Sequence, residues 1–102
     1  MFILNKMIIG ITLGCSSQMA LLKENGPCNI NEYGNGTDLN KFSWTNKANV
    51  IWVDQPAGAG FSSGVYDYNE DGVQVDFHAF LTEFYKQLPQ YKKNALYVTG
   101  KE

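Results

Sequence analysis

Short runs of apolar residues predict two strands in the second half of the chain. The run Val50-Ile51-Trp52-Val53 is rich in β-branched and aromatic side chains and is bounded by polar and turn residues. Such a run is typical of a strand buried on both faces. A second run, residues 95–99 (ALYVT), predicts another buried strand that leads into Gly100.

The apolar positions between these runs repeat with helical spacing. They follow i, i+3, i+4, i+7 periodicity and form one face of a helix predicted over about residues 70–88, which Pro89 ends. The positions on this face are Phe77, Phe80, Leu81, Phe84, Tyr85 and Leu88. Burying each large apolar side chain contributes about 1.5–3 kcal/mol, so we expect this face to pack on a sheet.

The first half of the chain has a weaker pattern. Residues 2–4 and 7–11 predict one strand or two short ones, and residues 18–23 (QMALLK) predict a short helix. Ser16 and Ser17 precede this helix and have hydroxyls that can cap it. Gly26 is expected to end it in a left-handed conformation, and residues 28–38 predict a loop. The apolar N-terminus also admits a signal peptide, but it lacks a clean small-residue cleavage site, which favours a strand.

Strands and helices thus alternate along the chain, which predicts an α/β fold. The expected arrangement is a parallel sheet with right-handed crossover connections. After the strand at residues 50–53, Asp54-Gln55-Pro56 and the glycines at 58 and 60 form a turn. A buried strand that enters a glycine-rich loop is the usual edge of a ligand crevice in such a sheet, the alternative being an ordinary turn.

Composition and charge narrow the class of protein. The chain has 102 residues, the size of one small domain, and 44% of them are hydrophobic, as in an ordinary globular protein. The net charge of −2 and the scattered basic residues argue against a nucleic-acid partner. The apolar N-terminal run is too short to span a membrane. One histidine and two distant cysteines predict no metal site and no metal cofactor.

The cysteines and one asparagine carry weaker signals. Cys15 and Cys28 permit a single bridge but not a disulfide scaffold. Asn35-Gly36-Thr37 is a sequon for N-glycosylation in a Gly/Asn-rich loop, and it favours a secreted protein.

Few residues suggest catalysis by themselves. His78 lies beside the apolar face of the predicted helix, and no partner for a catalytic base is near it in the sequence. Ser16 and Ser17 lack the G-x-S-x-G elbow, so capping is the better interpretation. The last strand followed by Gly100 has the pattern of a nucleophile elbow, but no serine follows within the 102 residues.

Four blocks together resemble the serine carboxypeptidase family. Residues 14–17 (GCSS) with 20–27 (ALLKENGP) resemble its G-C-S-S…E-N-G-P block, and residues 43–62 resemble the block that follows. Residues 76–91 look like its F-L…F-F…F-P-E-Y helix, and residues 96–100 (LYVTG) look like the strand that enters its G-E-S-Y-A-G elbow. The blocks occur in the family's order and cover nearly the whole chain from Gly14 onward.

The resemblance implies a partial α/β-hydrolase fold. Residues 1–102 would be a fragment of one such domain, an incomplete domain that ends at the nucleophile elbow. The family removes C-terminal residues from peptides with a Ser-Asp-His triad, which occurs in that order in this fold. The triad would lie beyond this segment, so we expect no catalytic residue here and no activity of the chain alone.

The resemblance also assigns roles to a few residues. Glu24 matches a family glutamate that helps to bind the terminal carboxylate of the substrate, because a protonated carboxyl can donate a hydrogen bond to it. The family's second acid matches either Lys101, in strict register, or Glu102 with a slip of one residue. Cys15 matches a cysteine whose partner comes much later, which leaves it unpaired unless it bonds to Cys28.

One departure concerns the oxyanion hole. The family has Gly-Gly-Pro where this chain has residues 11–13 (ITL), and the second of these glycines supplies an oxyanion-hole N–H. Loss of one such donor typically costs about 10²–10³ in rate. Either this copy is degenerate or the first dozen residues come from a misread gene.

The expected function is that of a serine-type carboxypeptidase acting through an acyl-enzyme, with the C-terminus of a peptide as partner. The alternatives are a family acyltransferase or lyase on the same scaffold, and a truncated product without enzyme activity. The resemblance and the sequon together imply the secretory pathway, with an extracellular, vacuolar or lysosomal destination.

Overall fold

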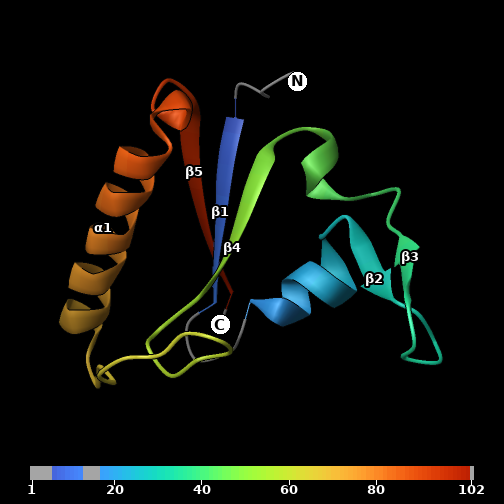
Figure 1. Cartoon of the computed structure of the whole chain (residues 1–102), viewed down its shortest axis with the longest axis horizontal. Coiled ribbons are helices and arrows are strands. Elements are labelled where there is room, and N and C mark those ends of the chain that lie inside the picture. Colours follow the sequence, from blue (N-terminus) through green and yellow to red (C-terminus); the bar gives the residue numbers. More distant parts are fainter. Residues whose placement is uncertain (1–5, 13–16, 102) are drawn as a thin grey trace.

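A parallel three-stranded sheet forms the centre of the molecule (Figure 1). The computed structural model of the protein describes residues 6–12 and 17–101. The central strand is β1 (Lys6–Thr12), with β4 (Asn49–Asp54) on one side and β5 (Ala95–Lys101) on the other, both parallel to it. This confirms the predicted parallel sheet, while the N-terminal segment at residues 2–4 lies outside the described residues.

The amphipathic helix covers one side of this sheet. α1 (Glu70–Gln87) connects β4 to β5 and so crosses over β1. The side chain of Asn69 accepts a hydrogen bond from Gly72 N at 2.8 Å and caps the helix. The short 3₁₀ turn η3 (Pro89–Tyr91) follows α1, as the helix-ending proline predicts. The predicted helix is therefore confirmed to within a residue at its end.

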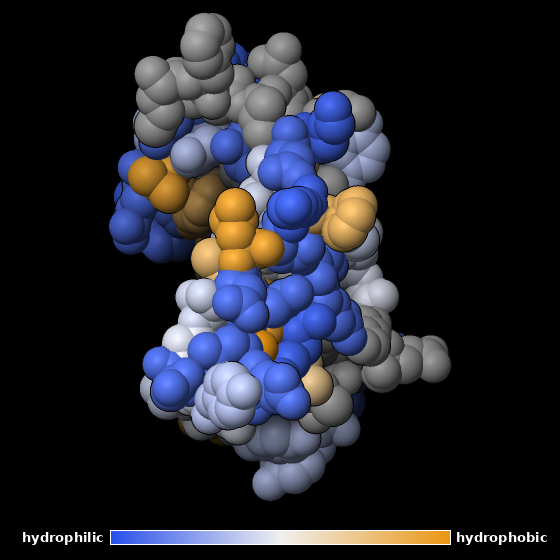
Figure 2. Space-filling view, turned by 90° about the vertical axis from the view of Figure 1, so that its right-hand side faces the viewer, coloured by the Kyte–Doolittle hydropathy of each residue, from blue (hydrophilic) through white to orange (hydrophobic). Residues whose placement is uncertain are grey.

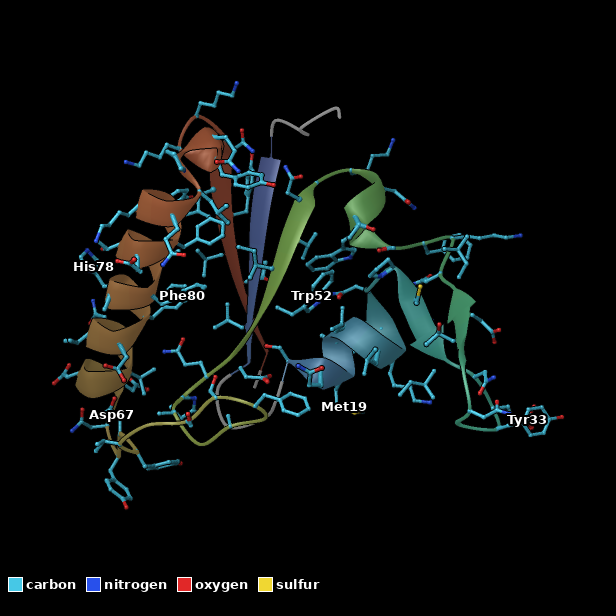
Figure 3. The ribbon with its side chains drawn as sticks, viewed as in Figure 1. Met19, Tyr33, Trp52, Asp67, His78 and Phe80 are labelled. Atoms are coloured by element: carbon cyan, nitrogen blue, oxygen red, sulfur yellow. The ribbon has the colours of Figure 1, made fainter. Side chains whose placement is uncertain are left out.

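The aromatic side chains of α1 form a row on the side of the sheet. Phe77 and Phe80 have ring centroids 6.0 Å apart, Phe80 and Phe84 6.2 Å, and Phe84 and Tyr91 6.0 Å. Figure 3 shows Phe80 pointing from α1 toward the sheet and His78 pointing away from it. The 3.6-residue period thus identified the packed face of the helix correctly.

The other side of the sheet carries short elements. η1 (Ala20–Glu24) is a turn of π-helix, η2 (Trp44–Asn46) is a 3₁₀ turn, and β2 (Cys28–Ile30) pairs with β3 (Thr37–Leu39) in an antiparallel hairpin. The prediction of a plain loop over residues 28–38 was wrong, because strands of three residues are too short to display an alternating pattern.

Gly26 ends η1 because its backbone lies close to the backbone of Leu21, and not because it adopts a left-handed conformation. It is absent from the glycines with positive φ, so the predicted left-handed cap was wrong. A Cβ at this position would overlap the carbonyl oxygen of Leu21, and Gly26 N donates to Ala20 O at 3.3 Å. The glycine is needed here because the chain folds back onto its own helical turn.

The two apolar strands are less buried than their sequences predict. All six residues of β4 are half-buried, and residues 95–100 of β5 are exposed, with Tyr97 49% and Val98 51% accessible. β5 is an edge strand, so only one of its sides has a neighbour. Among the residues with described side chains, the buried apolar ones are the small Ala48 and Pro56, whereas four polar side chains are buried: Ser17, Ser43, Gln55 and Asn94.

Candidate functional site

The three parallel strands end together at one edge of the sheet. Thr12 is in register with Asp54 of β4 and with Lys101 of β5, so their carboxyl ends coincide. Ligand crevices of open α/β sheets lie outside this edge. Thr12 belongs to a regular strand here, so its backbone has an extended conformation.

Asp54 organises the loops at this edge. Its carboxylate accepts hydrogen bonds from Ser17 N at 2.7 Å and from Phe61 N at 3.0 Å, and Gln18 Nε2 donates to it at 3.3 Å. The Ser62 hydroxyl donates to the Asp54 carbonyl at 2.6 Å. The carboxylate thus joins the segment after β1 to the glycine-rich turn after β4.

Ser17 lies directly before the helical residues that lead into η1. Its hydroxyl donates to the carbonyl of Val53, and the residue is 1% exposed. The hydroxyl thus fastens this segment to the end of β4, and its role as a helix cap stays a prediction. Ser16 lies outside the described residues.

A cavity opens between the end of β4 and α1. Its volume is about 300 Å³. The lining includes Asp54, Ser62 and Ser63 on the side of β4, and Asp76, Phe77 and Phe80 on the helix. Gln55 is buried at its rim, where its Nε2 donates to Val73 O of α1 at 2.9 Å. The loop that leaves the sheet is in this way fixed to the second turn of the helix.

Glu24 extends from a backbone that its neighbours hold tightly. Asn40 Nδ2 donates to the carbonyls of Glu24 at 3.0 Å and Gly26 at 2.9 Å. The carbonyl of Asn25 accepts from the Ser43 hydroxyl and from Trp44 N, each at 3.0 Å. The Glu24 side chain is exposed, so a rigid turn presents this carboxyl to solvent.

Trp52 connects this turn to the sheet. Its Nε1 donates to Asn25 Oδ1 at 2.9 Å, and Figure 3 shows the indole pointing from β4 toward η1. Sequence reasoning treated Trp52 only as an apolar strand residue and did not single out Asn25, Asn40 or Ser43. The hydroxyl of Ser43 accepts from Thr45 N at 3.2 Å, and a serine directly before a short helix is a capping signal that could have identified it.

The other predicted site residues are not brought together in the described part of the chain. Cys28 has a free, half-buried thiol in β2, and Cys15 lies outside the described residues, so their bridge stays a prediction. Glu102 also lies outside them. Asn35 is exposed in the turn between β2 and β3, and His78 is exposed on the outer side of α1, as expected for a histidine without a catalytic role.

One pair of carboxyl groups interacts near the start of α1. Partial desolvation, a hydrogen bond with Asp76 and the negative charge of Asp76 together raise the pKa of Asp67 above the ordinary value of an aspartate. Within residues 6–12 and 17–101, no group of three or more His, Cys, Asp or Glu residues could hold a metal ion. None of the helices in the described part of the chain is long and apolar enough to cross a membrane.

A parallel sheet with a crossover helix and a cavity near the end of β4 is the arrangement of α/β proteins, a class that binds ligands at the carboxyl edge of its sheet. Comparison with protein families identifies the particular class. The family model described as serine carboxypeptidase matches residues 14–101. The chain belongs to the serine carboxypeptidase family.

Individual relatives agree with this assignment. The chain is 45% identical over 91 residues to serine carboxypeptidase-like 48 of Arabidopsis thaliana, and 43% identical over 93 residues to serine carboxypeptidase 3 of Oryza sativa subsp. japonica. It is 38% identical over 89 residues to carboxypeptidase sxa2 of Schizosaccharomyces pombe. In each case the match covers 85% of this chain but only 18% of the relative.

Proposed function

We propose that the protein is part of a serine-type carboxypeptidase that removes C-terminal residues from peptides through an acyl-enzyme. The match of residues 14–101 to the family carries this proposal. The parallel sheet and the β4–α1–β5 crossover support a place within an α/β-hydrolase domain, of which this chain is one portion. Its setting would be the secretory pathway, with an extracellular, vacuolar or lysosomal destination.

In this proposal the chain supplies one wall of the peptidase site and none of its triad. Asp54 positions the loops at the carboxyl edge of the sheet, and Glu24 binds the terminal carboxylate of the peptide. A protonated glutamic acid can donate a hydrogen bond to a carboxylate, and a second acid close to it would favour this protonated form. The nucleophilic serine would come from the elbow that follows β5, so the chain of 102 residues is inactive alone.

The direct test of this proposal uses a blocked dipeptide. The purified 102-residue chain should release no C-terminal amino acid above a heat-killed control, whereas a product that continues through the elbow and the rest of the domain should release it. Turnover by the short chain would overturn its assigned inactivity. Transfer of an acyl group without peptide hydrolysis by the long product would instead identify an acyltransferase.

The role of Glu24 has a separate readout in the long product. Glu24→Ala removes the donor and should raise KM for a peptide with a free C-terminal carboxylate, with little effect on the corresponding C-terminal amide. Glu32→Ala, at an exposed acid in the turn between β2 and β3, is the matched control and should change neither. An equal effect of Glu24→Ala on both substrates would contradict carboxylate binding.

A further inference from the structure

The turn between β2 and β3 presents a glycosylation sequon at the edge of the molecule. Asn35, Gly36 and Thr37 are all exposed, as are the residues on either side of them from Glu32 to Leu39. Figure 1 places this hairpin on the opposite side of the sheet from α1, and Figure 2 shows that this side of the molecule is mainly hydrophilic. A modification here would extend into solvent without displacing a packed element.

Asn31 holds the side chain of Asn35 in one orientation. Asn31 Nδ2 donates to Asn35 Oδ1 at 2.9 Å, while Asn35 N donates to Asn31 Oδ1 at 3.2 Å. The carboxamide oxygen of Asn35 is therefore turned toward Asn31. Its nitrogen lies on the other branch of the same planar group and makes no hydrogen bond with another described residue. This nitrogen is the atom that accepts an N-linked glycan.

Tyr33 provides an aromatic surface two residues before this asparagine. Its side chain is 83% exposed, and Figure 3 shows it at the tip of the hairpin, pointing away from the rest of the molecule. Gly34 between them has φ of +69°, a left-handed conformation that reverses the chain sharply. An aromatic face carries partial negative charge, to which the slightly positive C–H groups on the face of a sugar ring are attracted.

We propose that Asn35 carries an N-linked glycan and that the ring of Tyr33 packs against its first N-acetylglucosamine. The donor would be an oligosaccharide linked to a lipid pyrophosphate. The Asn35 amide nitrogen forms the bond to C1 of the sugar as the bond from C1 to the pyrophosphate oxygen breaks. The lipid pyrophosphate leaves with that electron pair, and the amide nitrogen loses one proton to a base.

The sequence makes the site simple to test, since residues 35–37 are its one N-x-S/T triplet. The full chain is expressed behind a cleavable signal peptide in insect cells, and total protein, cellular and secreted, is analysed by intact mass with and without peptide N-glycosidase. We expect a mass shift that the glycosidase removes, retained in Thr37→Ser and lost in Asn35→Gln and Thr37→Ala. An unglycosylated wild-type chain recovered after signal cleavage would overturn the proposal.

The contribution of Tyr33 is tested in the same cells. Tyr33→Ala should lower the glycosylated share of the protein, and the matched control Tyr68→Ala, at a tyrosine that is 90% exposed in another loop, should leave it unchanged. In the glycosylated wild type, nuclear Overhauser effects should connect the Tyr33 ring to the first sugar. Equal glycosylated shares without such effects would overturn the stacking. Because the signal peptide is supplied, these outcomes do not depend on the proposed peptidase function.

Discussion

Single polar side chains determine how the loops meet the sheet. Asp54 accepts from the backbone on both sides of the strand end, and Asn40 and Trp52 hold the turn that presents Glu24. The sequence placed Asp54 in the turn after an apolar run, and the structure adds the two loops that its carboxylate joins. The partners of Asn25, which are Ser43 and Trp52, could not be predicted, because they lie 18 and 27 residues from it along the chain.

Replacement of the Asp54 carboxylate should release both loops. Hydrogen bonds to a charged group contribute about 1.5–3 kcal/mol each, so Asp54→Ala should greatly accelerate hydrogen exchange of the Ser17 and Phe61 amides. Amide exchange of the full chain, followed by NMR, measures this. Asp38→Ala, at an exposed acid of β3, should leave both amides unchanged, and retained protection in Asp54→Ala would show that the carboxylate does not hold the loops.

The pKa of Asp67 should depend on its neighbour. Asp76→Asn removes a negative charge, and the amide can still donate a hydrogen bond to the ionised Asp67, so the pKa of Asp67 should fall toward that of an ordinary aspartate. The carboxyl ¹³C shift of Asp67, titrated by NMR, reports it. The pKa of Asp67 is higher in the folded protein than in the unfolded chain. The contribution of this group to the free energy of unfolding is therefore fully present at a pH below the pKa of the unfolded state, and it is lost as the pH rises through the pKa of the folded state. A pKa unchanged by Asp76→Asn would refute the coupling, and Glu83→Gln is the control.

At the scale of elements, periodic segments were predictable and short ones were not. α1 was predicted closely because eighteen residues display the helical period several times. The hairpin of β2 and β3 was missed, since its pairing involves three residues on each strand. The burial of β5 was overestimated. An apolar run indicates that a strand can be covered by another layer of the fold, but it does not indicate whether the same stretch of chain contains that layer.

The inner face of α1 should stabilise the helix, and its outer face should not. Phe80 is half-buried, so Phe80→Ala should lower the free energy of opening of the central α1 amides by about 1 kcal/mol, half the value for a fully buried large side chain. Hydrogen exchange of these amides measures the change. His78→Ala, on the outer face of the same helix, should have no such effect. Equal effects of the two substitutions would mean that α1 does not pack on the sheet.

At the scale of the whole molecule, the fold has layers but little apolar core. Among the described side chains, only Ala48 and Pro56 are both apolar and buried, and several large side chains of β5 remain exposed. The class of fold followed from the alternation of strands and helices. The incomplete core did not follow from the composition, because 44% hydrophobic residues is ordinary for a globular protein.

The isolated chain should therefore unfold over a broad range or aggregate. Because the apolar core is small, few contacts break cooperatively during unfolding. The open edges of the sheet can pair with other chains, which favours aggregation. Thermal unfolding followed by far-UV circular dichroism should not coincide with the change in fluorescence of Trp44 and Trp52. A single sharp transition in both signals would contradict this expectation.

The central claim is that this chain is the portion of a serine carboxypeptidase that precedes the catalytic serine. The most direct measurement is the nucleotide sequence of the transcript and its gene through codon 102 and beyond. We expect the reading frame to continue into the rest of the elbow, with Ser-Tyr-Ala-Gly, and later to supply the aspartate and histidine of the triad. A stop codon directly after position 102 would contradict it and would favour a truncated product without enzyme activity.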